Sequence, residues 1–201
     1  QISLAPTTTT LTSDVTPSIM GSLVTFTASV TSAVGTPTGS IVLSENGTVL
    51  ATCGLVTGSC SMPLIGLSLG THTLVATYGG DAINAGSVSA GYVQFVSKIP
   101  STTTVSSSAN PSTFGGSVAF AIAVSTNDGV TATGSVSLSD GSLGLGSCTL
   151  TAGACTITIS NLSVGSHSIT AGFGGDLTHQ PSTSAVLRSE EHTSELQSPY
   201  V

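Results

Sequence analysis

The sequence has very little positive charge. Only two of its 201 residues are basic, Lys98 and Arg188, and the formal net charge is −7. So few cations can neither neutralise a phosphate backbone nor bind an anionic membrane surface. No apolar run reaches the length of about eighteen residues that is typical of a membrane-spanning helix. We therefore expect no nucleic-acid partner and no membrane insertion by this segment.

Charged and aromatic side chains are also scarce. Charged residues make up 5% of the chain, aromatic residues make up 4%, and tryptophan is absent. Serine and threonine together supply about a third of the residues, so we expect hydroxyl groups to form many of the hydrogen bonds between the surface and water. Because 39% of the residues are apolar and they alternate regularly with polar ones, we expect folded rather than disordered segments.

The chain repeats itself. The stretch "GTHTLVATYGGD" at residues 70–81 returns as "GSHSITAGFGGD" at residues 165–176, and the earlier part of each copy matches at an offset one residue shorter. One extra residue therefore enters the second copy, within residues 127–133. A repeat of this length indicates two duplicated domains of about 90 residues each. Because the chain begins with Gln1 rather than methionine, we expect it to be part of a longer product.

Apolar residues in each copy recur at every second position, which is the period of a strand with one buried face. Turn-forming residues separate these runs at the short intervals that are typical of a sandwich. The predicted fold class is all-β, with two tandem Ig-like antiparallel β-sandwich domains at residues 1–97 and 101–187. Residues 98–100 form the predicted linker, and Pro100 should restrict swivelling there.

The order of motifs resembles a known family. "TTTT" is followed by P-S and G-S-x-V-x-F, then by "PTGSIVL", and then by L-S-x-G-T-H-T-L-V-A-T-Y-G-G-D. This order resembles the bacterial Ig-like domains of group 3, and the resemblance covers nearly all of residues 7–187. The second copy departs from it at Phe173, where the first has Tyr78, and at Ala132, where the first has Pro37. The resemblance implies an Ig-like fold in large secreted or surface proteins, mostly as spacers and only sometimes as binders.

Each copy contains one pair of cysteines, Cys53 with Cys60 and Cys148 with Cys155. Six residues including a glycine separate each pair, which predicts a hairpin with the cysteines facing each other on the buried side. An even count in a chain of extracytoplasmic type favours one disulfide per domain. A pair of buried thiols is the first alternative. The second is a zinc site that also uses His72 or His167, although three ligands at this spacing match no familiar zinc motif.

The repeated "GGD" ends in Asp81 and Asp176, and an aspartate there is expected to accept backbone hydrogen bonds in a turn. Calcium between domains is the alternative, but one aspartate supplies too few of the oxygens that calcium requires. The motifs of common enzyme classes are missing, and Lys98, the only lysine, lies in the linker and cannot form an isopeptide in a core. We expect no catalytic residues, no metal and no cofactor.

The function predicted from these observations is a non-catalytic spacer in a larger secreted or cell-surface bacterial protein. Its partners would be the neighbouring domains of the same polypeptide. The alternative is an adhesive or carbohydrate-binding module that contacts a glycan or a surface protein. Tyr92 and Phe95 are the candidate binding residues, because two positions three apart on a strand cannot both face inward.

The C-terminal peptide "RSEEHTSELQS" breaks the repeat at residues 188–198. Where the first copy has the apolar run of residues 93–96, these positions read Arg, Ser, Glu and Glu. The peptide resembles the in-frame translation of a common short-read sequencing adapter, with one adapter codon for each of its eleven residues. We therefore expect residues 188–201 to be a non-native and functionally silent tail, with the last strand of the second domain ending after Leu187.

Overall fold

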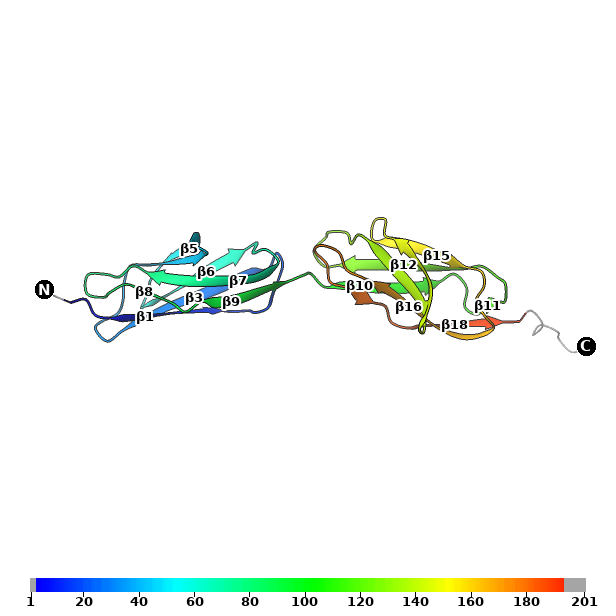
Figure 1. Cartoon of the computed structure of the whole chain (residues 1–201), viewed down its shortest axis with the longest axis horizontal. Helices are drawn as coiled ribbons and strands as arrows, with labels where there is room; N and C mark the ends of the chain where they lie inside the picture. Colours follow the sequence, from blue (N-terminus) through cyan, green and yellow to red (C-terminus); the bar gives the residue numbers. More distant parts are fainter. Residues whose placement is uncertain (1–2, 194–201) are drawn as a thin grey trace, which may run out of the picture. The chain divides into compact units, whose positions relative to one another are not determined.

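The structure is a computed structural model that describes residues 3–193, and all regular secondary structure in this range is β. The chain divides into two compact units, Gln1–Ser97 and Lys98–Val201 (Figure 1). The strands of each unit follow the alternating apolar pattern of the sequence, so the predicted all-β fold with two tandem domains is confirmed. None of the described residues belongs to a helix long and apolar enough to cross a bilayer.

The first unit contains nine strands, two of which are only two residues long. They are β1 (Thr7–Ser13), β2 (Ser18–Ile19), β3 (Leu23–Ser32), β4 (Ser40–Glu45), β5 (Thr48–Gly54), β6 (Ser59–Ile65), β7 (Gly70–Tyr78), β8 (Ser87–Val88) and β9 (Tyr92–Ser97). One sheet has the order β1-β3-β6, and the other has the order β2-β9-β7-β4-β5 with β8 paired to β7. The pairing of β2 with β9 is parallel, whereas the other pairs are antiparallel.

The second unit repeats this arrangement strand for strand. Its strands are β10 (Ser101–Ser107), β11 (Ser112–Thr113), β12 (Val118–Thr126), β13 (Ser135–Asp140), β14 (Leu143–Thr149), β15 (Ala154–Ile159), β16 (Gly165–Phe173), β17 (Ser182–Thr183) and β18 (Leu187–His192). The two sheets have the orders β10-β12-β15 and β11-β18-β16-β13-β14, with β17 paired to β16. The duplication in the sequence is therefore a duplication of complete sandwiches.

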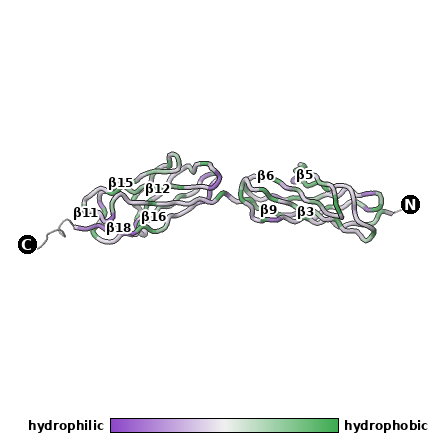
Figure 2. Tube along the Cα trace, turned by 180° about the vertical axis from the view of Figure 1, so that it is seen from behind, coloured by the Kyte–Doolittle hydropathy of each residue, from purple (hydrophilic) through white to green (hydrophobic). Residues whose placement is uncertain are grey.

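The core of each unit lies between its two sheets. In the first unit, the smaller sheet contributes Val24, Phe26 and Met62, and the larger sheet contributes Ile41 and Leu74, all almost completely buried. Corresponding residues fill the second core, with Phe120 in place of Phe26. Figure 2 shows hydrophobic residues spread along the strands of both units rather than gathered in one segment. This is the pattern that the period of two predicts.

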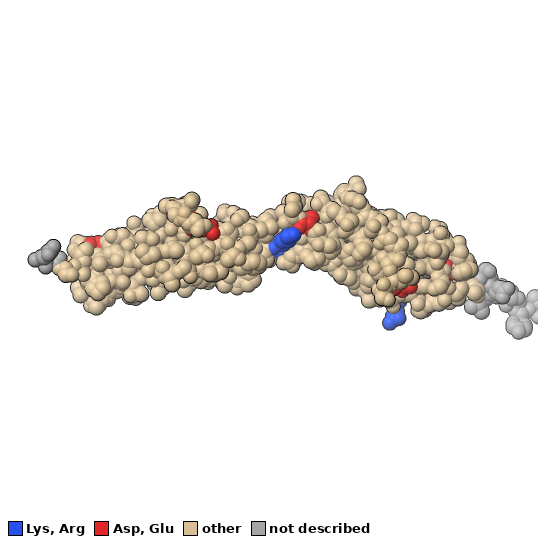
Figure 3. Space-filling model, viewed as in Figure 1, with Lys and Arg blue, Asp and Glu red and all other residues tan. Residues whose placement is uncertain are grey.

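The outer face of the smaller sheet carries rows of hydroxyl groups. Thr8, Thr10 and Thr12 on β1 are exposed, while the residues between them point toward the core. On β10 of the second unit, Thr102, Thr104 and Ser106 occupy the equivalent exposed positions. Figure 3 shows how few charged atoms lie on the face of the molecule that it presents.

The last strand of the second unit extends further than the sequence predicts. β18 continues to His192 and pairs with β16, so the expectation that this strand ends after Leu187 is wrong. The backbone hydrogen bonds of a sheet need no particular side chain, and the register set by the neighbouring strands holds β18 in place. This pairing buries the carboxylate of Glu191, which is only 2% exposed, and the loss of its hydration is unfavourable. Residues 194–201 of the predicted tail lie outside the described residues.

Candidate functional site

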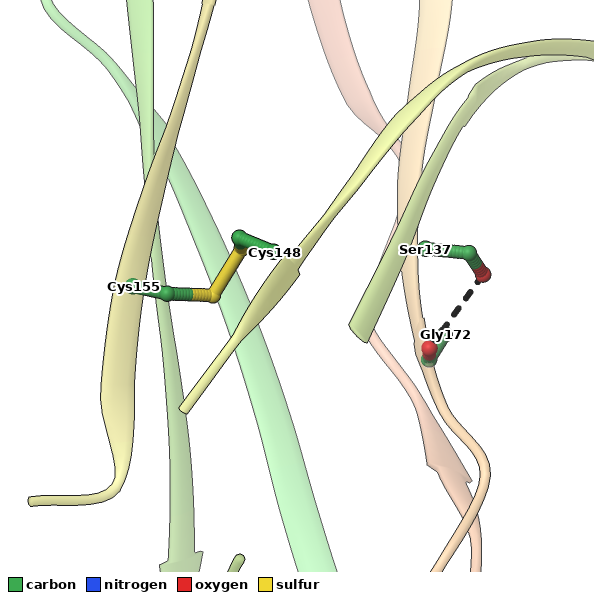
Figure 4. Close-up of a disulfide and its surroundings, with 4 residues drawn as sticks. All are labelled: Ser137, Cys148, Cys155 and Gly172. Atoms are coloured by element: carbon green, nitrogen blue, oxygen red, sulfur yellow. Dashed lines mark hydrogen bonds between the residues drawn. A yellow bond between two sulfur atoms is a disulfide. The ribbon is translucent and has the colours of Figure 1, made fainter. Parts of the chain in front are cut away.

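The cysteines of each unit form a disulfide between its two sheets. Cys53 on β5 is bonded to Cys60 on β6, with 5.9 Å between their Cα atoms. Cys148 on β14 is bonded to Cys155 on β15 in the same way, at 6.0 Å. In Figure 4 this second bond spans the gap between the two strands, and the hydrogen bond from Ser137 to the carbonyl of Gly172 joins two neighbouring strands of one sheet.

The predicted hairpin between the cysteines is wrong in one respect, because β5 and β6 belong to different sheets. The chain crosses from one sheet to the other through a tight turn in which Thr57 and Gly58 have φ values of 50° and 80°. Ala152 and Gly153 repeat these left-handed conformations at 51° and 77°. The disulfide therefore links the two layers of the sandwich directly beside the turn, which limits how far their edges can separate.

A buried histidine and a carboxylate form an ion pair at the end of each larger sheet. His72 on β7 lies with Nδ1 3.0 Å from both carboxylate oxygens of Glu45, and its Nε2 donates to the carbonyl of Ser68 at 2.9 Å. In the second unit, Nδ1 of His167 lies 2.6 Å from Asp140, and Nε2 donates to the carbonyl of Ser163 at 2.8 Å. Because a carboxylate and a carbonyl both accept, only the imidazolium form, with a proton on each ring nitrogen, satisfies both contacts of each histidine.

These contacts determine the pKa values of the two histidines. Burial alone would lower the pKa of His72, but the hydrogen bonds to Glu45 and Ser68 raise it above its ordinary value. For His167, the hydrogen bond to Asp140 raises the pKa and outweighs the opposing effect of burial. Each histidine thus carries its charge because a carboxylate lies beside it.

The zinc alternative does not fit this geometry. Both ring nitrogens of His72 and His167 already donate to oxygen atoms, and the four cysteine sulfurs are joined in disulfides. Within residues 3–193, no group of three or more histidine, cysteine, aspartate or glutamate side chains is arranged to hold a metal ion.

The aspartates of the "GGD" turns organise the loops that follow them. Asp81 accepts backbone hydrogen bonds from Thr38, Ile83 and Asn84, and the side-chain amide of Asn84 donates to both of its oxygens at 3.0 Å. These hydrogen bonds, with that of Asn84 first, hold the pKa of Asp81 far below its usual range. Asp176 has the same position in the second unit and accepts from Thr133, Thr178 and His179. The predicted role in a turn agrees with these contacts.

The two candidate binding residues face opposite ways. Tyr92 is half-buried and packs edge-on against Phe26 in the core, with ring centroids 6.1 Å apart and planes at 82°. Phe95 points outward from β9 and is 47% exposed. Val93 on the same strand and Ile19 on the adjacent β2 are also exposed, so Phe95 belongs to a small apolar patch.

A shallow depression of about 390 Å³ lies on the outer face of the smaller sheet of the second unit. Ala121 and Ala123 line it from β12, where the first unit has the larger Thr27 and Ser29. Ile122 of β12 and threonine, serine, alanine and cysteine residues of β10 and β15 complete its lining. No aromatic or charged side chain contributes, so the depression lacks the groups that usually orient a sugar or a small ligand.

The comparison with known families is decisive for the fold. The profile of the bacterial Ig-like domain (group 3) family matches residues 8–97 and again residues 103–189. The chain belongs to this family. The two matched segments of the bacterial Ig-like family correspond to the two sandwiches, and the resemblance predicted from the motifs is confirmed. No curated protein matches the sequence at a significant level.

Several solved structures resemble this bacterial Ig-like tandem, all at low sequence identity. The fibronectin(III)-like modules of Clostridium thermocellum CbhA are 15% identical, with 95% of this chain and 98% of that chain covered and a TM-score of 0.40. The human OSCAR ligand-binding domain is 16% identical, with 92% and 99% covered and a TM-score of 0.37. The D0-D1 domain of Intimin is 13% identical over the same shares, with a TM-score of 0.34.

Sequence reasoning missed the carboxylate partners of the buried histidines. Glu45 and Asp140 are equivalent in the repeat, as are His72 and His167, so an acidic residue and a histidine recur together. In a chain with so few charges, this joint recurrence is a signal of contact that the strand pattern alone does not give. Asp128, the second carboxylate beside His179, has no such signal because it lies in the loop that the repeat changes.

Proposed function

We propose that the chain is a non-catalytic spacer within a larger secreted or cell-surface bacterial protein, where it separates the domains on either side. The observation that carries this proposal is the nature of what is duplicated. Each unit repeats a disulfide, a histidine–carboxylate pair and an aspartate-capped loop. All of these groups are satisfied inside their own unit, so what is repeated stabilises the fold and leaves no reactive group.

The residues that connect the units support the same proposal. β9 ends at Ser97 and β10 begins at Ser101, so three residues separate the last strand of one unit from the first of the next. These residues are hydrogen-bonded to the second unit through Ile99, whose N–H donates to Thr178 and whose carbonyl accepts from Gln180. A spacer needs such short, bonded connections, because each free residue would let its modules swivel.

The disulfides support a location outside the cytoplasm. Reducing systems keep most cytosolic thiols unpaired, whereas disulfides persist in secreted and surface proteins. Each sandwich is small and contains few aromatic residues, so a covalent link between its sheets adds stability that the core supplies only in part.

The test of the spacer is to vary the number of units and measure reach and binding separately. A binding domain of known ligand would be displayed on cells on top of no copy, one copy or both copies of the repeat. We expect ligand capture by large beads to increase with each copy, while the affinity for soluble ligand stays constant. Saturable binding of the isolated chain to a glycan array in the micromolar range would contradict the proposal.

Adhesion is the second candidate function, and the exposed patch of Ile19, Val93 and Phe95 favours it. The second unit has Thr113, Arg188 and Glu190 at these positions, so only the first unit presents the patch. Replacing Phe95 by serine should abolish any glycan binding that the array detects. Val88→Ser is the matched control, because Val88 is also exposed and β8 pairs with the C-terminal end of β7, beyond the residues that pair with β9.

A further inference from the structure

The residues that enter the second unit are held by the loop that follows β16. Ile99 donates its N–H to the carbonyl of Thr178 at 2.9 Å, and Gln180 donates its N–H to the carbonyl of Ile99 at 2.8 Å. The side chain of Gln180 donates to the carbonyl of Lys98 at 2.9 Å, and the Lys98 ammonium donates to the carbonyl of Asp176. We call residues 98–100 the connecting segment and residues 176–180 the holding loop.

The first unit has the same backbone arrangement with a neutral side chain beneath it. Ala5 donates to the carbonyl of Ile83 and accepts from the N–H of Ala85, each at 2.8 Å. Asn84 is completely buried under this contact and donates its amide to Asp81. An amide does not titrate, so this contact is indifferent to pH around neutrality.

In the second unit a histidine replaces the asparagine, and a second carboxylate joins it. His179 is completely buried, with Nδ1 2.8 Å from Oδ2 of Asp176 and Nε2 3.4 Å from both carboxylate oxygens of Asp128. Asp128 lies in the loop that is one residue longer than its counterpart, and residues 33–37 of the first unit contain no acidic residue. The Thr178 hydroxyl also lies 3.2 Å from Nδ1. Because ionised carboxylates only accept hydrogen bonds, contact with both of them is satisfied only when each ring nitrogen carries a proton.

The geometry points to a proton-controlled latch: imidazolium His179, held between Asp176 and Asp128, keeps the holding loop closed on the connecting segment, and loss of its proton releases that segment. A neutral ring has one N–H, so one of its nitrogens would face a carboxylate lone pair to lone pair. The contact to Asp128 is the longer one and breaks first. Thr178 and Gln180, which hold Ile99, flank His179 directly.

The charged groups that face His179 are Asp176 in its own loop, Asp128 in the loop after β12 and the Lys98 ammonium on the Asp176 carbonyl. The hydrogen bond to Asp176 raises the pKa of His179 against the opposing effect of burial, and Asp128 raises it further. Burial raises the pKa of each aspartate, but hydrogen bonds, including those from His179, outweigh it and lower both. The ion pairs therefore stabilise the closed holding loop fully at a pH below about 6.5, the pKa of histidine in the unfolded chain. This stabilisation is lost as pH rises through the raised pKa of His179.

Trypsin reports the latch directly, because Lys98 is the only lysine in the chain and lies in the connecting segment. Cleavage after Lys98 requires this segment to leave the holding loop. The rate of release of residues 1–98 would be measured on the full chain between about pH 6.5 and about pH 9, relative to a small peptide substrate at each pH. We expect the relative rate to rise with pH. The larger the difference between the His179 pKa in the folded and unfolded chain, the larger the rise, up to about tenfold for a difference of 1 in pKa.

His179→Asn is the matched variant, because it restores the residue of the first unit. Its relative cleavage rate should not change with pH, and Asp128→Asn should move the rise to lower pH. An equal pH dependence in wild type and His179→Asn would overturn the proposal. The ring resonances of His179, followed by NMR in the unmodified chain, provide the second measurement: they should titrate at higher pH than in the urea-unfolded chain, and coincident titrations would also overturn it.

Discussion

The last strands of the two units, β9 and β18, occupy the same place between a two-residue strand and the long central strand, but they present different side chains to the core. Gln94 and Val96 point inward from β9, and Ser189 and Glu191 occupy their positions on β18. Val96 is apolar, whereas Glu191 buries a carboxylate of which Oε1 has no partner and Oε2 accepts from Ser112. The hydroxyl of Ser189 is buried without a partner as well. Gln94 also leaves its Oε1 without a partner, but its amide nitrogen donates to Ser18 and to the carbonyl of Val15.

This difference separates two contributions to the stability of a strand: its backbone pairing with neighbouring strands and the packing of its side chains. The register of β18 follows from the neighbouring strands and from the chain length, because Gly165 pairs with Glu191 as Gly70 pairs with Val96. Of the side chains, Leu187 packs against the core and Glu191 gains one hydrogen bond from Ser112, but a buried carboxylate without full hydrogen bonding opposes this position of the strand. A sequence can therefore complete a sheet whose core it fits poorly.

The largest effect should come from giving the first unit the side chain of the second. Val96→Glu removes a buried valine and introduces a buried carboxylate, so we expect the first unit to lose about 3 kcal/mol of unfolding free energy. Hydrogen exchange resolved by unit would measure it in the full chain. Val93→Glu is the control, because Val93 on the same strand is 58% exposed and should cost less than about 0.5 kcal/mol. Equal losses in both variants would show that the position does not matter.

Removal of a disulfide should have the next largest effect, and it should be equal in the two units. Both bonds close loops with a sequence separation of 7, so Cys53→Ala/Cys60→Ala and Cys148→Ala/Cys155→Ala should each cost about 2.5 kcal/mol. Denaturant unfolding with hydrogen exchange would assign each loss to its own unit. Counting free thiols in the denatured chain is the control, and four reactive thiols would contradict the bonds.

The reciprocal replacement, Glu191→Val, should stabilise the second unit by about 2 kcal/mol. The gain should be smaller than the loss in Val96→Glu, because the replacement also removes the hydrogen bond that Glu191 accepts from Ser112. Adding Ser189→Gln, which restores the pair found in the first unit, should raise it further. No gain in either variant would mean that Glu191 is better accommodated than its contacts indicate.

If residues 188–198 come from a sequencing adapter, as we expect, the native second unit ends in a different strand that is more like β9. Sequencing of the genomic locus should show different codons after Leu187, with an apolar residue at the position of Glu191. A genome that encodes "RSEEHTSELQS" at this point would refute the prediction and make β18 a native strand.

The smallest effect concerns the histidine–carboxylate pairs, which both units share. His72→Asn should destabilise the first unit by about 1 kcal/mol at a pH of about 6, which lies below the ordinary pKa of histidine. The raised pKa means that this contribution is present in acid and is lost as pH rises through it, so the variant and wild type should converge in alkali. Thermal unfolding against pH measures this, with Glu45→Gln as a second way to remove the pair.

The alternating pattern was sufficient to predict the fold, because each long strand has one face in the core and its sequence shows it. The two-residue strands β2 and β8 are too short to show any period, so sequence could not place them. The pairing of the cysteines was predictable from their spacing, but the crossing between sheets was not, because a tight turn of this kind also closes ordinary hairpins. The partners of the buried histidines depend on contacts between distant segments, which one sequence does not reveal.

The rows of threonine on β1 and β10 have a consequence for the surroundings in which the protein can work. Salt acts on exposed proteins mainly by screening charges, over distances of about 8 to 10 Å at physiological concentrations. A surface wetted by hydroxyl groups has few charges to screen, and the histidine of each ion pair is buried, so dissolved ions reach the pair only from the carboxylate side. The sandwiches should therefore behave nearly alike in fresh water and in brine, which suits a module exposed to an environment that the cell does not control.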